Sequence, residues 1–238
     1  MTSSARADLV FACAHLTDER LYSHQVQALS ASHNIQVMAF RDHASLAGMA
    51  NELLAAAPPR FTLIGLSLGG YLAFEVLRRA SERVARLVLL DTSARADTEA
   101  KQQGRRADIV KVQQGGIDAL IPELPGRWLH PAHRERTEIT ALMASMARSI
   151  GAGGQFNQQQ AMLGRPDSFA DLSRVTMPTL IACGREDPVT TLADHEAMHA
   201  CAPGSRLAVI EDCGHLSTIE QPEAVSTLLV DWLGQTGR

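Results

Sequence analysis

A five-residue pattern, Gly65-Leu66-Ser67-Leu68-Gly69, constrains this chain more than any other stretch of its sequence. The apolar run over residues 61–66 has no helical spacing and contains β-branched Ile64, which predicts a strand. The residues after the pattern have helical spacing and end in Arg78 and Arg79, whose charge suits a helix C-terminus. A serine at such a turn stands above the sheet in strained backbone, and the flanking glycines avoid collisions with the packed strand and helix.

The alternative interpretation of this pattern is a glycine-rich turn with an incidental serine. The predicted strand, the predicted helix and the additional Gly70 favour a functional turn instead. Such a turn places backbone N–H groups at a helix N-terminus, where negative charge is stabilised. The N–H of Leu68 is therefore the expected first donor to an oxyanion.

Short strand-like runs alternate with helical patterns along most of the chain. The predicted strands cover residues 9–12, 35–40, 61–66, 87–90, 179–183 and 207–210. The predicted helices cover residues 22–31, 191–201 and 222–233, with another between Ser45 and Pro58. This alternation predicts an α/β fold, a mostly parallel twisted sheet with helices on both faces. Functional groups should then gather beyond the carboxyl ends of the strands.

The alternation stops over residues 94–172, where helical segments are broken by glycines and prolines. We predict an inserted helical lid over 94–172, on a core of residues 1–93 and 173–238, because the segment exceeds an ordinary connection. The alternative is a set of helices that only widens the cover of the sheet. Apolar lid residues could form a wall of a substrate site, namely Trp128, Leu142, Met143, Met146, Phe156 and Met162. The glutamines at 155 and 158–160 are either polar contacts or plain surface.

The composition limits the classes of partner and compartment. A formal net charge of −4 over 238 residues argues against nucleic acid or an anionic membrane as a main partner. None of the four cysteines forms a C-x-x-C pair, so free thiols are favoured over disulfides or zinc. The polar N-terminus lacks a signal-peptide pattern and no stretch reaches membrane-spanning length, which predicts a cytoplasmic protein. The oligomeric state stays open.

Two later segments supply a base and an acid for Ser67. Asp187 follows the predicted strand over 179–183, and His215 follows the one over 207–210, so all three should share one sheet edge. The chain order Ser, Asp, His is the order found in hydrolases of this architecture. His215 would take the serine proton during attack, while Asp187 would orient the imidazole and stabilise its cation.

Other polar residues compete for these roles. Glu186 points the opposite way if the strand geometry continues, and Asp212 is expected to be a solvated loop residue. Of the other eight histidines, only His15 is expected near the site. We interpret the remaining candidates as polar surface, namely His130, His133, His195 and His199.

Over nearly its whole length the chain resembles the α/β-hydrolase superfamily. The resemblance is carried by residues 65–70, 184–187 and 213–223, which are similar to that superfamily's nucleophile elbow, acid loop and histidine loop. It implies Ser67 as nucleophile, Asp187 as acid and His215 as base. A reaction of this kind implies neither a metal nor an organic cofactor.

Within the superfamily the chain is most similar to small esterases and 3-oxoadipate enol-lactonases, whose caps carry an Arg-Trp-Phe stretch like residues 126–129. Trp128 is then a substrate contact, or alternatively a core residue of the lid. The family's first-strand loop reads His-Gly-x or Pro-Gly-x, and x gives the second oxyanion N–H. Cys13-Ala14-His15 takes that place here, which implies His15 as the second donor, with an alanine in place of the glycine.

Three hypotheses about function follow. The first is a serine hydrolase that cleaves a small carboxylic ester or lactone through an acyl-enzyme. The second is C–C bond hydrolysis or other non-ester chemistry on the same triad, because a fold does not fix a reaction. The third is a non-catalytic ligand-binding protein, which only the altered loop over residues 13–15 supports.

Overall fold

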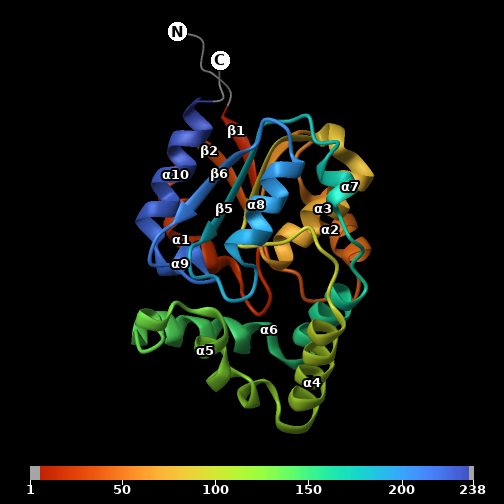
Figure 1. The fold of residues 1–238 in the computed structure, drawn as a ribbon, viewed down its shortest axis with the longest axis vertical. Helices are drawn as coiled ribbons and strands as arrows, with labels where there is room; N and C mark the ends of the chain where they lie inside the picture. The colour runs from red at the N-terminus through yellow and green to blue at the C-terminus, as the bar shows by residue number, and fades with distance from the viewer. Residues whose placement is uncertain (1–5, 236–238) are drawn as a thin grey trace.

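A single six-stranded parallel sheet organises the computed structural model, which describes residues 6–235 (Figure 1). The strands lie in the order β2-β1-β3-β4-β5-β6, and every neighbouring pair is parallel. Their bounds are β1 (Ala7–Ala12), β2 (His33–Met38), β3 (Phe61–Leu66), β4 (Val84–Leu90), β5 (Thr179–Gly184) and β6 (Arg206–Ile210). The predicted fold class is therefore confirmed.

Helices cover both faces of the sheet, as a parallel sheet requires. The α-helices are α1 (Ser23–Leu29), α2 (Leu46–Ala56), α3 (Leu68–Ala80), α4 (Glu99–Gly115), α5 (Leu124–Trp128), α6 (Thr137–Leu163), α7 (Phe169–Leu172), α8 (Leu192–Cys201), α9 (Ser217–Glu220) and α10 (Pro222–Gln235). Short 3₁₀ turns lie at Glu19–Tyr22, Ser81–Arg83, Ile117–Ala119, Ile121–Glu123 and Pro131–His133. Among these described residues, no helix combines the length and hydropathy needed to cross a membrane.

Side-chain alternation along the strands produces two hydrophobic cores, one on each face of the sheet. Leu9 and Phe11 of β1 belong to the core shared with α1 and α10. Val10 lies on the opposite face, in the core shared with α2, α3 and α8. Strands β3 and β5 are buried over their whole length, so the sheet's centre is a rigid platform for whatever stands at its carboxyl edge.

Helices α4, α5 and α6 stand together beyond the carboxyl edge of the sheet (Figure 1). α6 is kinked at Gly151, whose φ of 70° and ψ of 178° are not helical, within the glycine-rich break of the sequence. α7 instead packs beside α3, where the Arg78 guanidinium lies 2.7 Å from the Asp171 carboxylate. The helical cap is thus present, while its bounds at residues 94 and 172 stay a prediction.

Candidate active site

Ser67 occupies a strained turn between β3 and α3. Its φ of 54° and ψ of −109° lie in a region that non-glycine residues rarely adopt. The backbone around it is held by its N–H, which donates to Leu90 O at 3.0 Å, and by its C=O, which accepts from Tyr71 N–H at 3.1 Å. The Thr92 hydroxyl donates to the same carbonyl at 2.9 Å. The surrounding structure therefore fixes the serine in this conformation.

The glycines of the pattern are required by close backbone contacts. A Cβ atom at Gly65 would lie 2.3 Å from Gly69 O, and one at Gly69 would lie 2.1 Å from Ala12 O. Real Cβ atoms do not approach backbone so closely. The turn therefore depends on glycine at both positions, for the reason that the sequence indicated.

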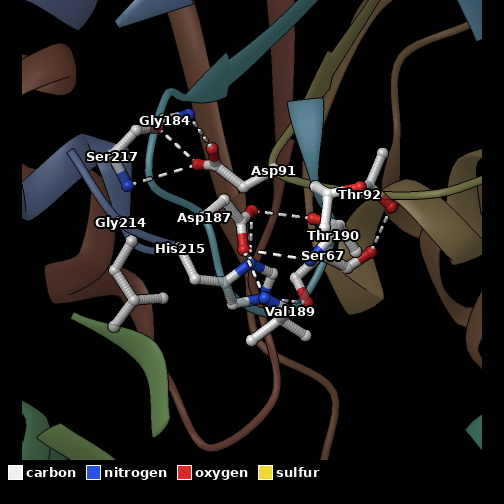
Figure 2. Close-up of polar contacts among 12 residues, drawn as sticks. Ser67, Asp91, Thr92, Gly184, Asp187, Val189, Thr190, Gly214, His215 and Ser217 are labelled. Atoms are coloured by element: carbon white, nitrogen blue, oxygen red, sulfur yellow. Dashed lines mark hydrogen bonds and ion pairs between the residues drawn. The ribbon is translucent and has the colours of Figure 1, made fainter. Parts of the chain in front are cut away.

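Three side chains from separate loops meet at the carboxyl edge of the sheet (Figure 2). His215 Nε2 lies 2.9 Å from Ser67 Oγ, and His215 Nδ1 lies 2.8 Å from Asp187 Oδ2. Because a carboxylate accepts at Nδ1, that nitrogen carries the proton and Nε2 accepts from the serine hydroxyl. All three side chains are buried, so their hydrogen bonds are shielded from water.

The Asp187 carboxylate is fully occupied by donors. Oδ1 accepts from Val189 N–H at 2.8 Å and Thr190 N–H at 3.0 Å, and Oδ2 accepts from the Thr190 hydroxyl at 2.7 Å (Figure 2). Burial alone would raise the pKa of Asp187, but His215 and these hydrogen bonds lower it overall. Asp187 is therefore held as a carboxylate facing the imidazole.

Burial and the neighbouring charge of Asp187 also act on the pKa of His215. Burial lowers its pKa, but the charge and hydrogen bond of Asp187 raise it to a greater extent, so its pKa lies above the ordinary value. Glu186, the competing acid, is exposed and accepts from Cys213 N–H at 3.1 Å. Asp212 is exposed as well. The carboxylate that meets His215 is that of Asp187.

A further buried carboxylate, Asp91, escaped the sequence analysis. It follows β4 with a φ of 42°, and its Oδ1 accepts from Gly184 N–H at 2.9 Å. Its Oδ2 accepts from the Ser217 hydroxyl at 2.5 Å (Figure 2). Burial, followed by the nearby charge of Asp187, raises the pKa of Asp91 to about 8. Asp91 links the ends of β4 and β5 to the histidine loop, and its position at a strand end was the available signal.

His15 is buried at the edge of the site, in the loop after β1. Its Nδ1 donates to Gln158 Oε1 at 2.8 Å, and Leu16 N–H donates to the same oxygen at 2.9 Å. Its Nε2 lies 3.3 Å from Gln159 Nε2. Burial and then the charge of Arg105 lower the pKa of His15 to about 3, so the ring is neutral. These two glutamines are polar contacts rather than surface.

The expected oxyanion donors are the backbone N–H groups of Leu68 and His15. Leu68 is the first residue of α3, so its N–H is one of the four that a helix leaves without an internal acceptor. His15 lines the same cavity as Ser67. The assignment of these two N–H groups to an oxyanion hole stays a prediction.

A small cavity of about 50 Å³ adjoins Ser67 and His215 beneath the lid. The other polar groups on its wall come from His15 and Arg105. The apolar part of the wall is formed by Ala14, Tyr71, Trp128, Met162, Val189 and Leu216. Ligand pockets usually measure about 300–1,000 Å³, so the lid is closed down over the nucleophile in this structure.

The residues of the predicted lid wall lie in different surroundings. Trp128 and Met162 line the cavity. Met143 and Met146 lie instead in the hydrophobic core, on one face of α6 before its kink. Phe156 is 37% exposed. The spacing of these residues in the sequence could not indicate which face of each half of α6 is buried, because the kink changes the direction of the faces after Gly151.

Two histidines interpreted as polar surface are buried, and that interpretation was wrong for them. His195 is fully buried and its Nε2 accepts from Thr92 N–H at 3.0 Å. His133 places its Nδ1 2.9 Å from Glu220 Oε2. Both satisfy backbone or carboxylate partners that come from distant parts of the chain, which a local pattern does not reveal. His199 is exposed, as predicted.

A larger hollow of about 640 Å³ lies at the other end of α3, beside Leu77, Arg78 and Arg174. Leu77, the first of its lining residues, comes ten residues after Ser67 along α3, a span of roughly 15 Å at 1.5 Å per residue. It holds no histidine, whereas the smaller cavity holds the Ser67–His215 pair. Size alone is therefore a poor guide to the active site in this molecule.

Comparison with known proteins shows the family of the chain. A model of the alpha/beta hydrolase family matches residues 17–228. A 3-oxoadipate enol-lactonase of Acinetobacter baylyi is 28% identical over 166 residues, which span 70% of this chain but 61% of that protein. A pimeloyl-[acyl-carrier protein] methyl ester esterase of Aromatoleum aromaticum is 30% identical over 79% of each chain. A thermophilic esterase from Thermogutta terrifontis superposes with a TM-score of 0.86 at 28% identity, over 96% of this chain and 90% of its own.

Proposed function

Because the chain belongs to the alpha/beta hydrolase family, we propose that it is a serine hydrolase that cleaves a small carboxylic ester or lactone. In this proposal Ser67 is the nucleophile, His215 the general base and acid, and Asp187 the residue that orients and stabilises the imidazole. The observation that carries it is the continuous hydrogen-bonded sequence from Ser67 Oγ through His215 to Asp187 Oδ2.

Acylation follows from the protonation states of these groups. His215 Nε2 is unprotonated, so it takes the hydroxyl proton as Ser67 Oγ attacks the carbonyl carbon. The imidazolium that forms is stabilised by the carboxylate of Asp187. The negative charge on the tetrahedral oxygen is placed beside the N–H groups of Leu68 and His15. His215 then gives its proton to the leaving alkoxide, and the acyl group stays on Ser67.

Deacylation repeats the same steps with water. His215 removes a proton from water, the hydroxide attacks the acyl carbon, and the serine recovers its proton as the acid leaves. With a lactone, the hydroxyl formed in the first step stays part of the acyl chain, so the second step releases a single hydroxy acid. The proposed reaction needs neither a metal nor an organic cofactor, because the three side chains supply the nucleophile and every proton transfer.

The choice of ester or lactone rests on the relatives. The similar proteins are named as an enol-lactonase, a methyl ester esterase and a thermophilic esterase. The size of the cavity beside Ser67 adds a condition. A substrate larger than a few atoms requires the lid, with its residues Trp128 and Met162, to move away from Ser67.

Hydrolysis of p-nitrophenyl acetate by the wild-type protein and by Ser67→Ala tests this proposal. We expect a measurable rate for the wild type and a loss of at least about 10³-fold for Ser67→Ala. Ser30→Ala is a matched control, because Ser30 is exposed and lies outside the cavity. Equal rates in Ser67→Ala and the wild type would contradict the proposed nucleophile. Tight ligand binding with no hydrolysis of any ester would favour a binding protein.

A further inference from the structure

A buried cluster of three charged groups lies between the core and the lid, beside the proposed nucleophile. Arg105 comes from α4, Arg165 follows α6, and Asp97 precedes α4. Their side chains are 16%, 4% and 1% exposed, respectively. Two guanidinium groups thus share one carboxylate in an environment that excludes most water.

The contacts define this cluster as an ion-paired unit with excess positive charge. Arg105 Nε donates to Asp97 Oδ2 at 2.6 Å. Arg165 Nη1 lies 2.6 Å from Asp97 Oδ1, as an ion pair rather than an aligned hydrogen bond. Burial would raise the pKa of Asp97, but the hydrogen bond and charges of the two arginines lower it overall, so it is ionised. Two positive charges and one negative charge leave a net charge of +1.

The remaining recorded contacts of the two arginines do not neutralise this charge. Arg105 Nη1 donates to Gln159 Oε1 at 3.1 Å and lies 3.0 Å from the sulfur of Met162. Arg165 stacks 4.0 Å from the centre of the Tyr71 ring and donates to a backbone carbonyl. All of these partners are neutral. The cluster therefore remains one negative charge short among the residues that the structure describes.

The excess charge faces the cavity that holds Ser67, because Arg105 is one of the residues on its wall. The hydrogen bonds of Arg105 use four of its five N–H groups. Nε and Nη2 donate to Asp97, the latter to Oδ1 at 3.4 Å, and Nη1 donates to the two neutral partners named above. A net charge buried without a counter-ion is costly unless something compensates it. A bound anion in the cavity would supply that compensation.

We propose that Arg105 recognises a carboxylate on the substrate, so that the ester or lactone cleaved at Ser67 also carries a free acid group. This inference rests on the proposed function. Arginine is suited to the task, because its planar fork binds carboxylates by charge-assisted hydrogen bonds. Asp97 and Gln159 position the guanidinium at the cavity wall, while Arg165 keeps Asp97 paired.

A competing role for Arg105 is long-range stabilisation of the oxyanion at Ser67. The two roles differ in what they require of the substrate. Oxyanion stabilisation would accelerate every ester to a similar extent, whereas carboxylate recognition favours only esters with an acid group. A pair of substrates that differ only in that group therefore separates the two roles.

Hydrolysis of monomethyl glutarate and of its neutral amide counterpart, methyl glutaramate, provides this pair, with the succinate and adipate homologues covering other lengths. We expect the wild type to favour the acid by roughly 10- to 100-fold in kcat/KM at one length or more, the range for a hydrogen bond to a charged group. Arg105→Gln should reduce this preference to about one. The adjacent Arg106→Gln is the matched control, because Arg106 is exposed on the same helix and carries the same charge.

Three results would overturn the inference. The first is a wild type with equal kcat/KM for acid and amide at every chain length. The second is an equal fall in kcat/KM for acid and amide in Arg105→Gln. The third is a loss of the preference for the acid in Arg106→Gln. Asp97 keeps Arg165 as a partner in Arg105→Gln, so this variant should fold, and its unfolding transition verifies that.

Binding of glutarate to the Ser67→Ala protein, measured by calorimetry, separates this inference from the proposed reaction because it needs no turnover. If the Ser67→Ala protein binds glutarate and the double variant with Arg105→Gln does not, the anion site is supported even if no ester is hydrolysed. Ester hydrolysis that depends on Ser67, without glutarate binding and without acid preference, overturns the anion site and leaves the proposed reaction standing.

Discussion

The imidazole of His133 in the lid lies 2.9 Å from the carboxylate of Glu220, which is fully buried at the end of α9. The same carboxylate accepts from His130 N–H at 2.8 Å and from Leu216 N–H at 3.2 Å. The backbone N–H of His215 in turn donates to Trp128 O at 2.7 Å. The lid is thus fastened directly to the loop that carries the proposed base.

This connection makes Glu220 a test of lid attachment. Glu220→Gln replaces one acceptor oxygen with a donor, so at least one of its three hydrogen bonds is lost within a buried site. We expect a loss of about 1–3 kcal/mol in the free energy of unfolding, measured by urea denaturation. Glu223→Gln is the control, because Glu223 is exposed in the first turn of α10. Equal stability of the two variants would refute a fastening role for Glu220.

The identity of the acid is tested by two neighbouring carboxyl groups. Asp187→Asn removes the charge that orients and stabilises His215, and we expect kcat to fall by about 10³–10⁴-fold at neutral pH. Glu186→Gln should leave kcat within about twofold, because Glu186 contacts Cys213 N–H rather than the imidazole. Ester hydrolysis assays on both variants measure this difference. The reverse ranking would transfer the acid role to Glu186.

The pH dependence of the reaction follows from the raised pKa of His215. A general base must be unprotonated, so activity should fall as the pH drops through the pKa of His215 in the free enzyme. Because Asp187 raises that pKa, the acid limb of kcat/KM should have its midpoint above the ordinary histidine value of 6.5. A profile measured on a neutral ester gives this midpoint. A midpoint well below 6.5 would contradict the assignment.

Asp91 should shape the pH dependence of stability. Its pKa is about 8 in the folded protein, against about 3.9 when unfolded. Between these values the folded state holds a proton that the unfolded state has lost, so this group's contribution decreases as the pH rises from 4 to 8. The free energy of unfolding should decrease by at most about 1.4 kcal/mol per pH unit, the slope for a difference of one bound proton. Asp91→Asn should flatten the curve of unfolding free energy against pH. A curve parallel to that of the wild type would mean that Asp91 stays ionised.

Local patterns sufficed for the sheet, because each strand is a short apolar run next to a turn or helix signal. Every predicted strand overlaps an observed one, with bounds that differ by three residues or fewer. The predicted α/β-hydrolase family is confirmed by the family match. Residues that follow directly on strands, such as Asp187 and His215, could be placed at one edge because parallel strands end together.

Features of the lid could not be predicted in the same way. Met146 is buried before the bend of α6 at Gly151, whereas Phe156 after the bend is 37% exposed. The ion pair of Arg165 with Asp97 joins two segments that are far apart in the sequence, and it depends on how those segments pack. These contacts are properties of the tertiary arrangement, which no local periodicity encodes.

The central claim is that Ser67 forms an acyl-enzyme, and mass spectrometry of the protein quenched in acid during turnover of p-nitrophenyl acetate tests it most directly. Ser67 lies in the tryptic peptide of residues 61–78, between Arg60 and Arg78. We expect one acetyl group on this peptide, on Ser67, and none on the corresponding peptide of Ser67→Ala. Acetylation at another residue, or rapid hydrolysis that survives in Ser67→Ala, would contradict it.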